Sequence, residues 1–173
     1  MDARRWWVGA AMLSLGGCAL MGRSSGPVRD FALRDAGGAE VGTVRLQGAS
    51  HGTRVTVRVH GLTPGMHGVH LHQTGVCEGP AFTSAGPHWN PTGKKHGWAN
   101  PEGHHMGDLP NLTVNADGTG MMDFSVEAPY AAGPTSVLDA DGSALVVHAS
   151  MDDNKTDPSG NSGARIACAA ITG

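Results

Sequence analysis

The feature that most constrains this fold is a short segment in which apolar and polar side chains alternate strictly. Residues 54–60 read Arg-Val-Thr-Val-Arg-Val-His, which gives Val55, Val57 and Val59 the same parity. Side chains two positions apart point to one side of a β-strand, so the segment predicts a half-buried strand. Similar short runs occur at residues 28–34, 41–47, 112–115, 121–126 and 144–148.

Turn-forming residues separate these runs, and no stretch after the N-terminal segment sustains a helical apolar period. The chain has 173 residues, of which 27 are glycine and 10 are proline. Several short antiparallel strands at regular spacing predict a single all-β domain, built as a sandwich or a flattened barrel. Residues 75–111 and 151–164 are long and rich in Gly, Pro, Asn and Asp, so we expect metal or a disulfide to order them.

The N-terminus has the pattern of an export signal. A basic head ending at Arg5 precedes an apolar run and small residues, which predicts a signal peptide over residues 1–17. Leu15-Gly-Gly-Cys18 resembles a bacterial lipobox, in which the cysteine receives lipid, although an ordinary secretory signal remains the alternative. We therefore expect lipidated Cys18 and a short tether over residues 18–27, a folded domain over 28–173, and a periplasmic, membrane-anchored lipoprotein.

The three cysteines fit this interpretation. An exported protein with Cys18, Cys77 and Cys168 has an odd thiol unless one is otherwise used, and lipidation of Cys18 leaves a pair. An oxidising periplasm permits a Cys77–Cys168 disulfide, which would close a long loop. The formal net charge is −3 and no basic patch is visible, so no nucleic-acid partner is expected.

Ten histidines are more than a core or a solvated face requires, and they indicate metal binding. His70 and His72 form a His-x-His pair, which places both rings on one face of a strand. His148 ends another predicted strand, and three imidazoles of this kind favour copper. His67 shares the parity of the core positions, so we expect a buried histidine bonded to the backbone.

A second group of candidate ligands lies in the first long loop. His88 stands between Pro87 and Pro91, and it is followed by two further histidines and an aspartate. Three imidazoles and one carboxylate make a closed tetrahedral set suited to zinc. The members of this set are His88, His96, His105 and Asp108.

Four motifs together resemble the copper-zinc superoxide dismutase family, of the bacterial periplasmic lipoprotein type. They are the His-x-His strand, Gly86-Pro-His-x-Asn-Pro91, His105-Met-Gly-Asp108-Leu and the segment from Gly160 to Cys168. The resemblance implies a Greek-key antiparallel sandwich or flattened barrel with long metal-binding and electrostatic loops. It also implies an oxidoreductase that converts two superoxide anions to O2 and H2O2 by Cu(II)/Cu(I) cycling and so protects the cell envelope.

Carried over residue by residue, the resemblance assigns a role to each candidate. His88 would bridge the two metals and take part in proton transfer, Arg165 would guide superoxide, and Asp152 would link a copper histidine to a zinc histidine. The implied ligands are His70, His72, His88 and His148 for copper, and His88, His96, His105 and Asp108 for zinc.

Two other functions, and the oligomeric state, remain open at this level. A copper-binding protein without turnover would carry the same copper ligands, but the presence of Arg165 favours an enzyme. A zinc hydrolase needs an open zinc position, whereas the expected zinc set already has four protein ligands. The sequence is compatible with a monomer and with a homodimer. His51, His60 and His104 are expected to be solvated rather than to bind metal.

Overall fold

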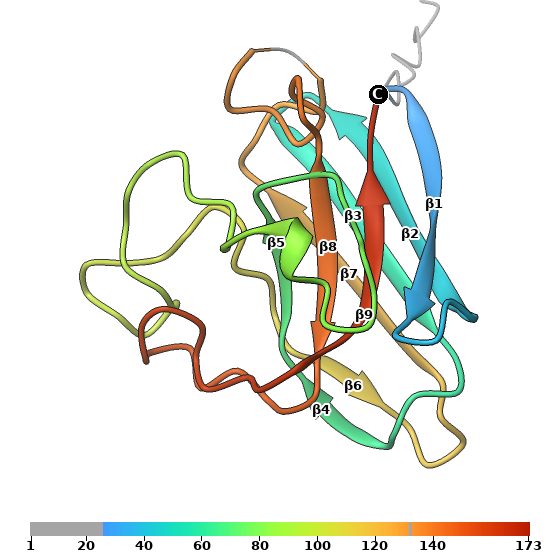
Figure 1. Ribbon diagram of the computed structural model, residues 1–173. Helices are drawn as coiled ribbons and strands as arrows, with labels where there is room; N and C mark the ends of the chain where they lie inside the picture. Colours follow the sequence, from blue (N-terminus) through green and yellow to red (C-terminus); the bar gives the residue numbers. More distant parts are fainter. Residues whose placement is uncertain (1–25, 132) are drawn as a thin grey trace, which may run out of the picture.

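The computed structural model describes residues 26–131 and 133–173, and its strands form one antiparallel sheet (Figure 1). The expected signal peptide and Cys18 lie outside the described residues. Gly26 and Pro27, which we expected to belong to the tether, already pair with Gly48 through backbone hydrogen bonds of 3.0 Å. The strands are β1 (Val28–Asp35), β2 (Glu40–Ala49), β3 (Gly52–Val59), β4 (Gly65–His67), β5 (Val69–His72), β6 (Leu112–Val114), β7 (Gly120–Val126), β8 (Ser143–His148) and β9 (Arg165–Ile171).

The sheet curls into a nearly closed barrel. Its strand order is β4-β6-β7-β3-β2-β1-β9-β8-β5, so the two end strands are β4 and β5. Only Gly68 separates these strands in the sequence, and its backbone bonds to Ser150 and His148 at 2.8 and 2.9 Å. The connections from β3 to β4 and from β5 to β6 cross other strands. The all-β expectation is confirmed, and the flattened-barrel form describes the molecule.

The apolar faces of the strands meet inside this barrel. Val55, Val57 and Val59 of β3 are buried, as their alternation predicts. Val69 and Leu71 of β5 belong to the same core cluster. Burial of such side chains contributes roughly 1.5 to 3 kcal/mol each, which makes this core the main source of stability.

Strand β9 was not among the expected strands, although it pairs with β8 along its length and with the end of β1. Its sequence, Arg-Ile-Ala-Cys-Ala-Ala-Ile, is rich in alanine, which is uncommon in strands. Alanine fits here because β9 is buried in the sheet, where Ala167 and Ala169 are fully enclosed. Tertiary packing therefore overrides the local preference.

Two long loops emerge on the same side of the barrel (Figure 1). The first joins β5 to β6 and contains one short 3-10 helix, η1 (Thr83–Ala85). The second joins β8 to β9. A disulfide between Cys77 and Cys168 ties the first loop to β9, with the two Cα atoms 5.8 Å apart. The expected pairing is present in the structure.

Candidate metal centre

Backbone pairing places two loop segments directly against strand β5. Leu71 donates its N–H to the Gly107 carbonyl and accepts a hydrogen bond from the Trp89 N–H, both at 2.8 Å. These contacts extend the sheet locally, so that His88 lies opposite His72. In the same way Asp108 lies opposite His70. The loop residues are thus brought beside the His-x-His strand.

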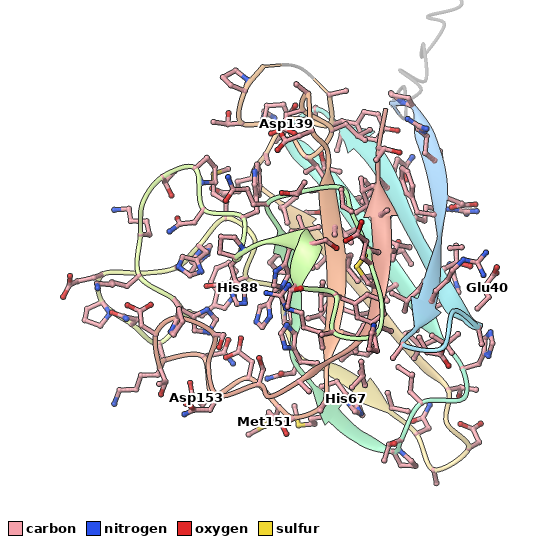
Figure 2. All side chains as sticks on the ribbon, viewed as in Figure 1. Glu40, His67, His88, Asp139, Met151 and Asp153 are labelled. Atoms are coloured by element: carbon pink, nitrogen blue, oxygen red, sulfur yellow. A yellow bond between two sulfur atoms is a disulfide. The ribbon has the colours of Figure 1, made fainter. Side chains whose placement is uncertain are left out.

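Four buried imidazoles converge beside β5, among them the labelled His88 (Figure 2). Each ring offers a nitrogen, and these nitrogens all lie within 4.8 Å of one another. A register irregularity between Val147 and His148 turns the end of β8, and such irregularities commonly redirect a side chain. The structure therefore brings together the four residues that the sequence predicts for copper, which are His70, His72, His88 and His148.

The unpartnered nitrogens of these rings identify the atoms that face a ligand. His70 Nδ1 and the Nε2 atoms of His72, His88 and His148 are buried and have no hydrogen-bond partner among the described residues. A buried polar atom without a partner is costly, and a metal ion satisfies all four of these atoms together. In contrast, the other nitrogens of His72 and His148 bond to backbone carbonyls at 2.8 and 3.1 Å, which fixes both ring orientations.

A second set of donors surrounds Asp108, which is almost fully buried. Its Oδ1 lies 3.0 Å from His96 Nδ1, 3.2 Å from His88 Nδ1 and 3.2 Å from His105 Nδ1. Donors about 2.0 Å from a tetrahedral zinc stand roughly 3.3 Å apart, so these separations match a closed zinc site. The Oδ2 atom accepts two backbone N–H groups, which holds the carboxylate in place.

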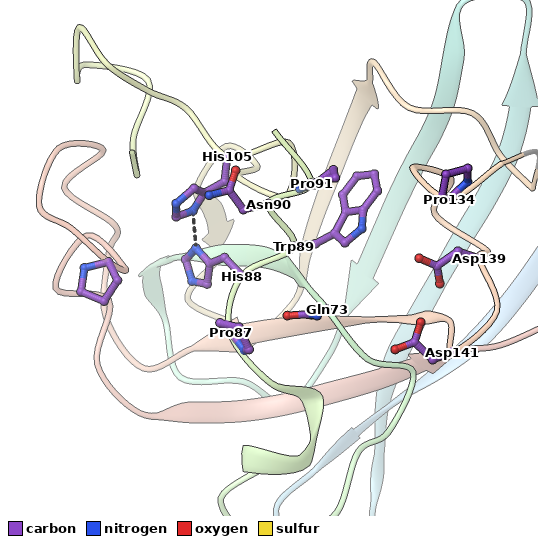
Figure 3. Close-up of a pocket in the computed structure, with 11 residues that line it drawn as sticks. Gln73, Pro87, His88, Trp89, Asn90, Pro91, His105, Pro134, Asp139 and Asp141 are labelled. Atoms are coloured by element: carbon purple, nitrogen blue, oxygen red, sulfur yellow. Dashed lines mark hydrogen bonds between the residues drawn. The ribbon is translucent and has the colours of Figure 1, made fainter. Parts of the chain in front are cut away.

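His105 completes this second set. Its Nδ1 lies 3.3 Å from His88 Nδ1, and both residues line a cavity of about 460 Å³ (Figure 3). His70 is an alternative fourth member of this set. It has a ring nitrogen within 4.8 Å of donor atoms on His88, His96 and Asp108. His70 Nε2, however, is already bonded to Asp152 at 2.7 Å, which leaves His70 Nδ1 for the first set.

His88 is the one residue that has a nitrogen in each set. Its Nδ1 lies among the donors around Asp108, and its buried Nε2 belongs to the other four imidazoles. The ring therefore offers one nitrogen to each donor set, as a histidine shared by two cations would have to.

Asp152 connects the two sets from the other side. Its carboxylate lies 2.7 Å from His70 Nε2 and 3.0 Å from His96 Nε2. The Asn111 side chain pairs with the backbone of Asp152 through bonds of 2.8 and 2.9 Å. Gly160 packs so closely that a Cβ there would lie 1.7 Å from Asp152 Oδ1. These contacts fix the carboxylate that orients one ring in each set.

Arg165 lies on β9 directly across from His148. Its Nη1 donates to the Phe82 carbonyl at 2.6 Å and its Nη2 donates to the Gly86 carbonyl at 2.7 Å. Among the ion pairs of the described residues, none includes Arg165. A held guanidinium without a carboxylate partner leaves its charge available to an anion.

Comparisons with known proteins decide the family. A sequence model described as copper/zinc superoxide dismutase (SODC) matches residues 40–171. The chain belongs to the copper/zinc superoxide dismutase family. Over 138 residues it is 43% identical to a Superoxide dismutase (Cu-Zn) of Caulobacter vibrioides, covering 78% of this chain and 79% of that protein.

Solved structures of the family have the same fold. A double mutant of a SOD-like protein from Bacillus subtilis superposes with a TM-score of 0.80 at 41% identity, covering 83% of this chain and 97% of that chain. The Cu/Zn superoxide dismutase from Brucella abortus gives a TM-score of 0.66 at 33% identity, covering 84% of this chain and 99% of that chain. The protein is accordingly a superoxide dismutase, an oxidoreductase that uses copper and zinc.

Burial keeps the four converging imidazoles of this dismutase in the neutral form that binds metal. It lowers the pKa of His70 to about 3 and that of His148 to about 4, so both rings are neutral at physiological pH, as metal ligands must be. Burial also raises the pKa of Asp108, but hydrogen bonds with His105, His88 and His96 outweigh this effect and hold that pKa well below its usual range. The aspartate is therefore an anion that can offset the charge of a bound cation.

The remaining histidines lie outside both sets. His67 is buried with its two nitrogens 2.7 and 2.8 Å from the carbonyls of His148 and Thr63, so the expected structural role is confirmed. His51 and His60 are exposed, as expected. His104 is in neither donor set, as expected, although its ring is only partly exposed because it stacks on Trp98 with centroids 3.4 Å apart.

Sequence reasoning found Asp152 but missed Asn111, which holds the Asp152 backbone, and Phe82, which bonds Arg165. Asn111 and Phe82 act through backbone contacts that no short motif encodes. One usable signal was the position of Asn111 immediately after Asp108-Leu-Pro, where an amide side chain can return toward the metal loop. Phe82 gave a weaker signal, because an isolated aromatic residue in a Gly- and Pro-rich loop indicates only a local apolar contact.

Proposed function

We propose that two donor sets sharing one histidine hold the two metals of this superoxide dismutase. The observation that carries the assignment is His88, whose Nδ1 and buried, unpartnered Nε2 belong to different sets. All-nitrogen ligation favours copper, and three nitrogens with one carboxylate oxygen suit zinc. Copper is assigned to His70, His72, His88 and His148, and zinc is assigned to His88, His96, His105 and Asp108.

When bound, copper supplies the redox chemistry, alternating between Cu(II) and Cu(I) as one superoxide is oxidised to O2 and a second is reduced. The protein contributes charge and position. Arg165 attracts superoxide and holds it beside His148, its cross-strand neighbour. The net charge of −3 disfavours anions at long range, so this local positive charge is the group that draws substrate to the site.

His88 moves a proton between the two halves of the reaction. Its Nε2 takes up a proton in the first half, while its Nδ1 stays among the donors around Asp108. In the second half Nε2 gives that proton to the peroxide, which takes its other proton from water. Asp152 keeps the rings of His70 and His96 fixed throughout, because it is bonded to both. The donors around Asp108 keep His88 oriented throughout, because the zinc that they would hold does not change its oxidation state.

Metal removal and replacement test this assignment. The purified protein is expected to contain one copper and one zinc per chain and to scavenge superoxide, because both donor sets are complete. Chelation should abolish scavenging, zinc alone should not restore it, and zinc with copper should restore it. Metal analysis and a superoxide-scavenging assay on the same samples provide the measurement. Full activity in a copper-free sample would contradict the assignment.

We propose further that the protein acts in the bacterial periplasm as a membrane-anchored lipoprotein. In this proposal residues 1–17 are removed, Cys18 carries the lipid, residues 18–27 form a tether whose last two residues pair with Gly48, and residues 28–173 form the enzyme. The N-terminal sequence pattern and the Cys77–Cys168 disulfide, which requires an oxidising compartment, support this location. In that location the enzyme would protect the cell envelope from superoxide.

The anchor can be tested by replacing the proposed lipid site. A Cys18→Ser variant is expected to move from the membrane fraction to the soluble fraction and to lose label from a radioactive fatty acid, while its scavenging activity per copper stays unchanged. Copper and zinc per chain, measured in the variant and the wild type, control for any effect of the substitution on the metal centre. Equal membrane association of the variant and the wild type would refute lipidation at Cys18.

A further inference from the structure

Phe82 occupies an unusual position in the loop before the metal ligands. Its side chain is buried against Cys168, Ala144 and Val146, beside the disulfide. Its backbone is left-handed, with φ 52° and ψ 29°. A residue with a side chain adopts this conformation at an energetic cost, whereas glycine adopts it freely. The chain nevertheless has phenylalanine here, so the buried ring must offset that cost.

The carbonyl of Phe82 has a direct contact with the substrate-guiding arginine. It accepts a hydrogen bond from Arg165 Nη1 at 2.6 Å. At the other end of η1, the Gly86 carbonyl accepts two hydrogen bonds. One comes from Arg165 Nη2 at 2.7 Å and the other from His72 Nδ1 at 2.8 Å. The orientation of the guanidinium therefore depends on the positions of the two carbonyls that flank this short helical turn.

The two ends of the turn are fixed by different means. Gly86 lies next to Pro87 and His88, so the metal ligands hold that end. Toward the N-terminus the disulfide is attached at Cys77, several residues before Phe82. The Phe82 N–H bonds to the Glu78 carbonyl at 3.0 Å, but the only buried side chain between Cys77 and η1 is the Phe82 ring. The Phe82 carbonyl also accepts the Ala85 N–H at 3.2 Å, so it is fixed relative to η1, and the buried ring in turn anchors this end of η1 beside the disulfide.

We propose that Phe82 is a positioning residue for Arg165. Its ring, packed against the disulfide, holds a left-handed backbone whose carbonyl orients the guanidinium toward the anion beside the copper ligands. This inference rests on the proposed role of Arg165. It predicts that removing the ring weakens anion binding and dismutation while leaving both metals in place, because the hydrogen bonds of Phe82 within the described residues go to Glu78, Ala85 and Arg165 and to no member of either donor set.

The test compares Phe82→Gly, which keeps the left-handed backbone accessible, with Phe82→Leu, which keeps a buried apolar side chain. Both are made in the copper- and zinc-loaded enzyme, and azide binding to Cu(II) is measured by optical titration beside kcat/KM for superoxide. Phe82→Gly is expected to weaken azide binding and lower kcat/KM by roughly three- to tenfold. Phe82→Leu should recover most of the loss. Phe82→Ala carries the same prediction as the glycine variant if the latter does not fold.

A double-mutant cycle with Arg165→Ala shows whether the effect passes through the arginine. In the Arg165→Ala background, Phe82→Gly should cause no further loss of azide affinity. An equal loss in both backgrounds, or wild-type affinity in Phe82→Gly, overturns the inference. If Arg165→Ala alone leaves azide affinity and rate unchanged, then the proposed role of Arg165 fails and the role of Phe82 fails with it. Metal content measured for every variant separates these outcomes from loss of copper.

Discussion

Replacing His88 with alanine is expected to abolish dismutation and to deplete both metals. This residue contributes Nδ1 to the donors around Asp108 and Nε2 to the four-imidazole set. Its removal leaves each set one donor short and leaves the buried Asp108 carboxylate with less compensation for its charge. Copper and zinc per chain, measured by elemental analysis, should both fall well below one, and the superoxide-scavenging rate should fall to that of the buffer.

The matched control is His148→Ala, which removes a donor from one set only. His148 contributes to the four-imidazole set and is not among the donors around Asp108. This variant should therefore lose copper and dismutation while its zinc content stays near normal. Retained activity in His148→Ala, or normal copper and zinc in His88→Ala, would show that the assignment of the two sets is wrong.

The second large effect is expected from the disulfide. Replacing both Cys77 and Cys168 with serine opens a loop that spans 91 residues of sequence. In the chain-entropy description, closing such a loop stabilises a protein by about 4 to 5 kcal/mol, which is a large part of the total for one domain. The free energy of unfolding in guanidinium chloride should fall by about that amount.

Reduction of the wild-type protein provides the control for this prediction. Reduced wild type and the double serine variant should unfold at similar denaturant concentrations, because both lack the same cross-link. A decrease below about 1 kcal/mol would mean that packing in the loop, and not the covalent link, holds the first loop to β9. Single serine variants are less informative, since each leaves a free thiol.

Alternation in the sequence was a good guide to the strands with a polar face. Strand β3 was predicted because Val55, Val57 and Val59 alternate with polar residues, and the same reasoning located β7. Strand β9 escaped prediction, because its alanines, Ala167, Ala169 and Ala170, are weak strand formers and give no apolar-polar alternation in the sequence. The order of strands also could not be read locally, since β1 pairs with β9 through contacts between the two ends of the domain.

The candidate site was predictable in residue type but not in arrangement. The His-x-His pair placed His70 and His72 on one face, and the structure brings both into one donor set. No local pattern indicated that His88 would lie opposite His72, because that pairing depends on the folded loop. The left-handed backbone of Phe82 was equally invisible, since it is stabilised only by long-range packing.

The Asp152 carboxylate, bonded to a ring in each donor set, has a thermodynamic consequence. Its Oδ2 is bonded to His70 and its Oδ1 to His96, so we expect occupancy at one position to change the affinity at the other. Linkage requires this effect to be reciprocal: the factor by which zinc alters copper affinity equals the factor by which copper alters zinc affinity. On this expectation the two ions share one cooperative equilibrium, and a measured affinity for either ion has to state the occupancy of the other position.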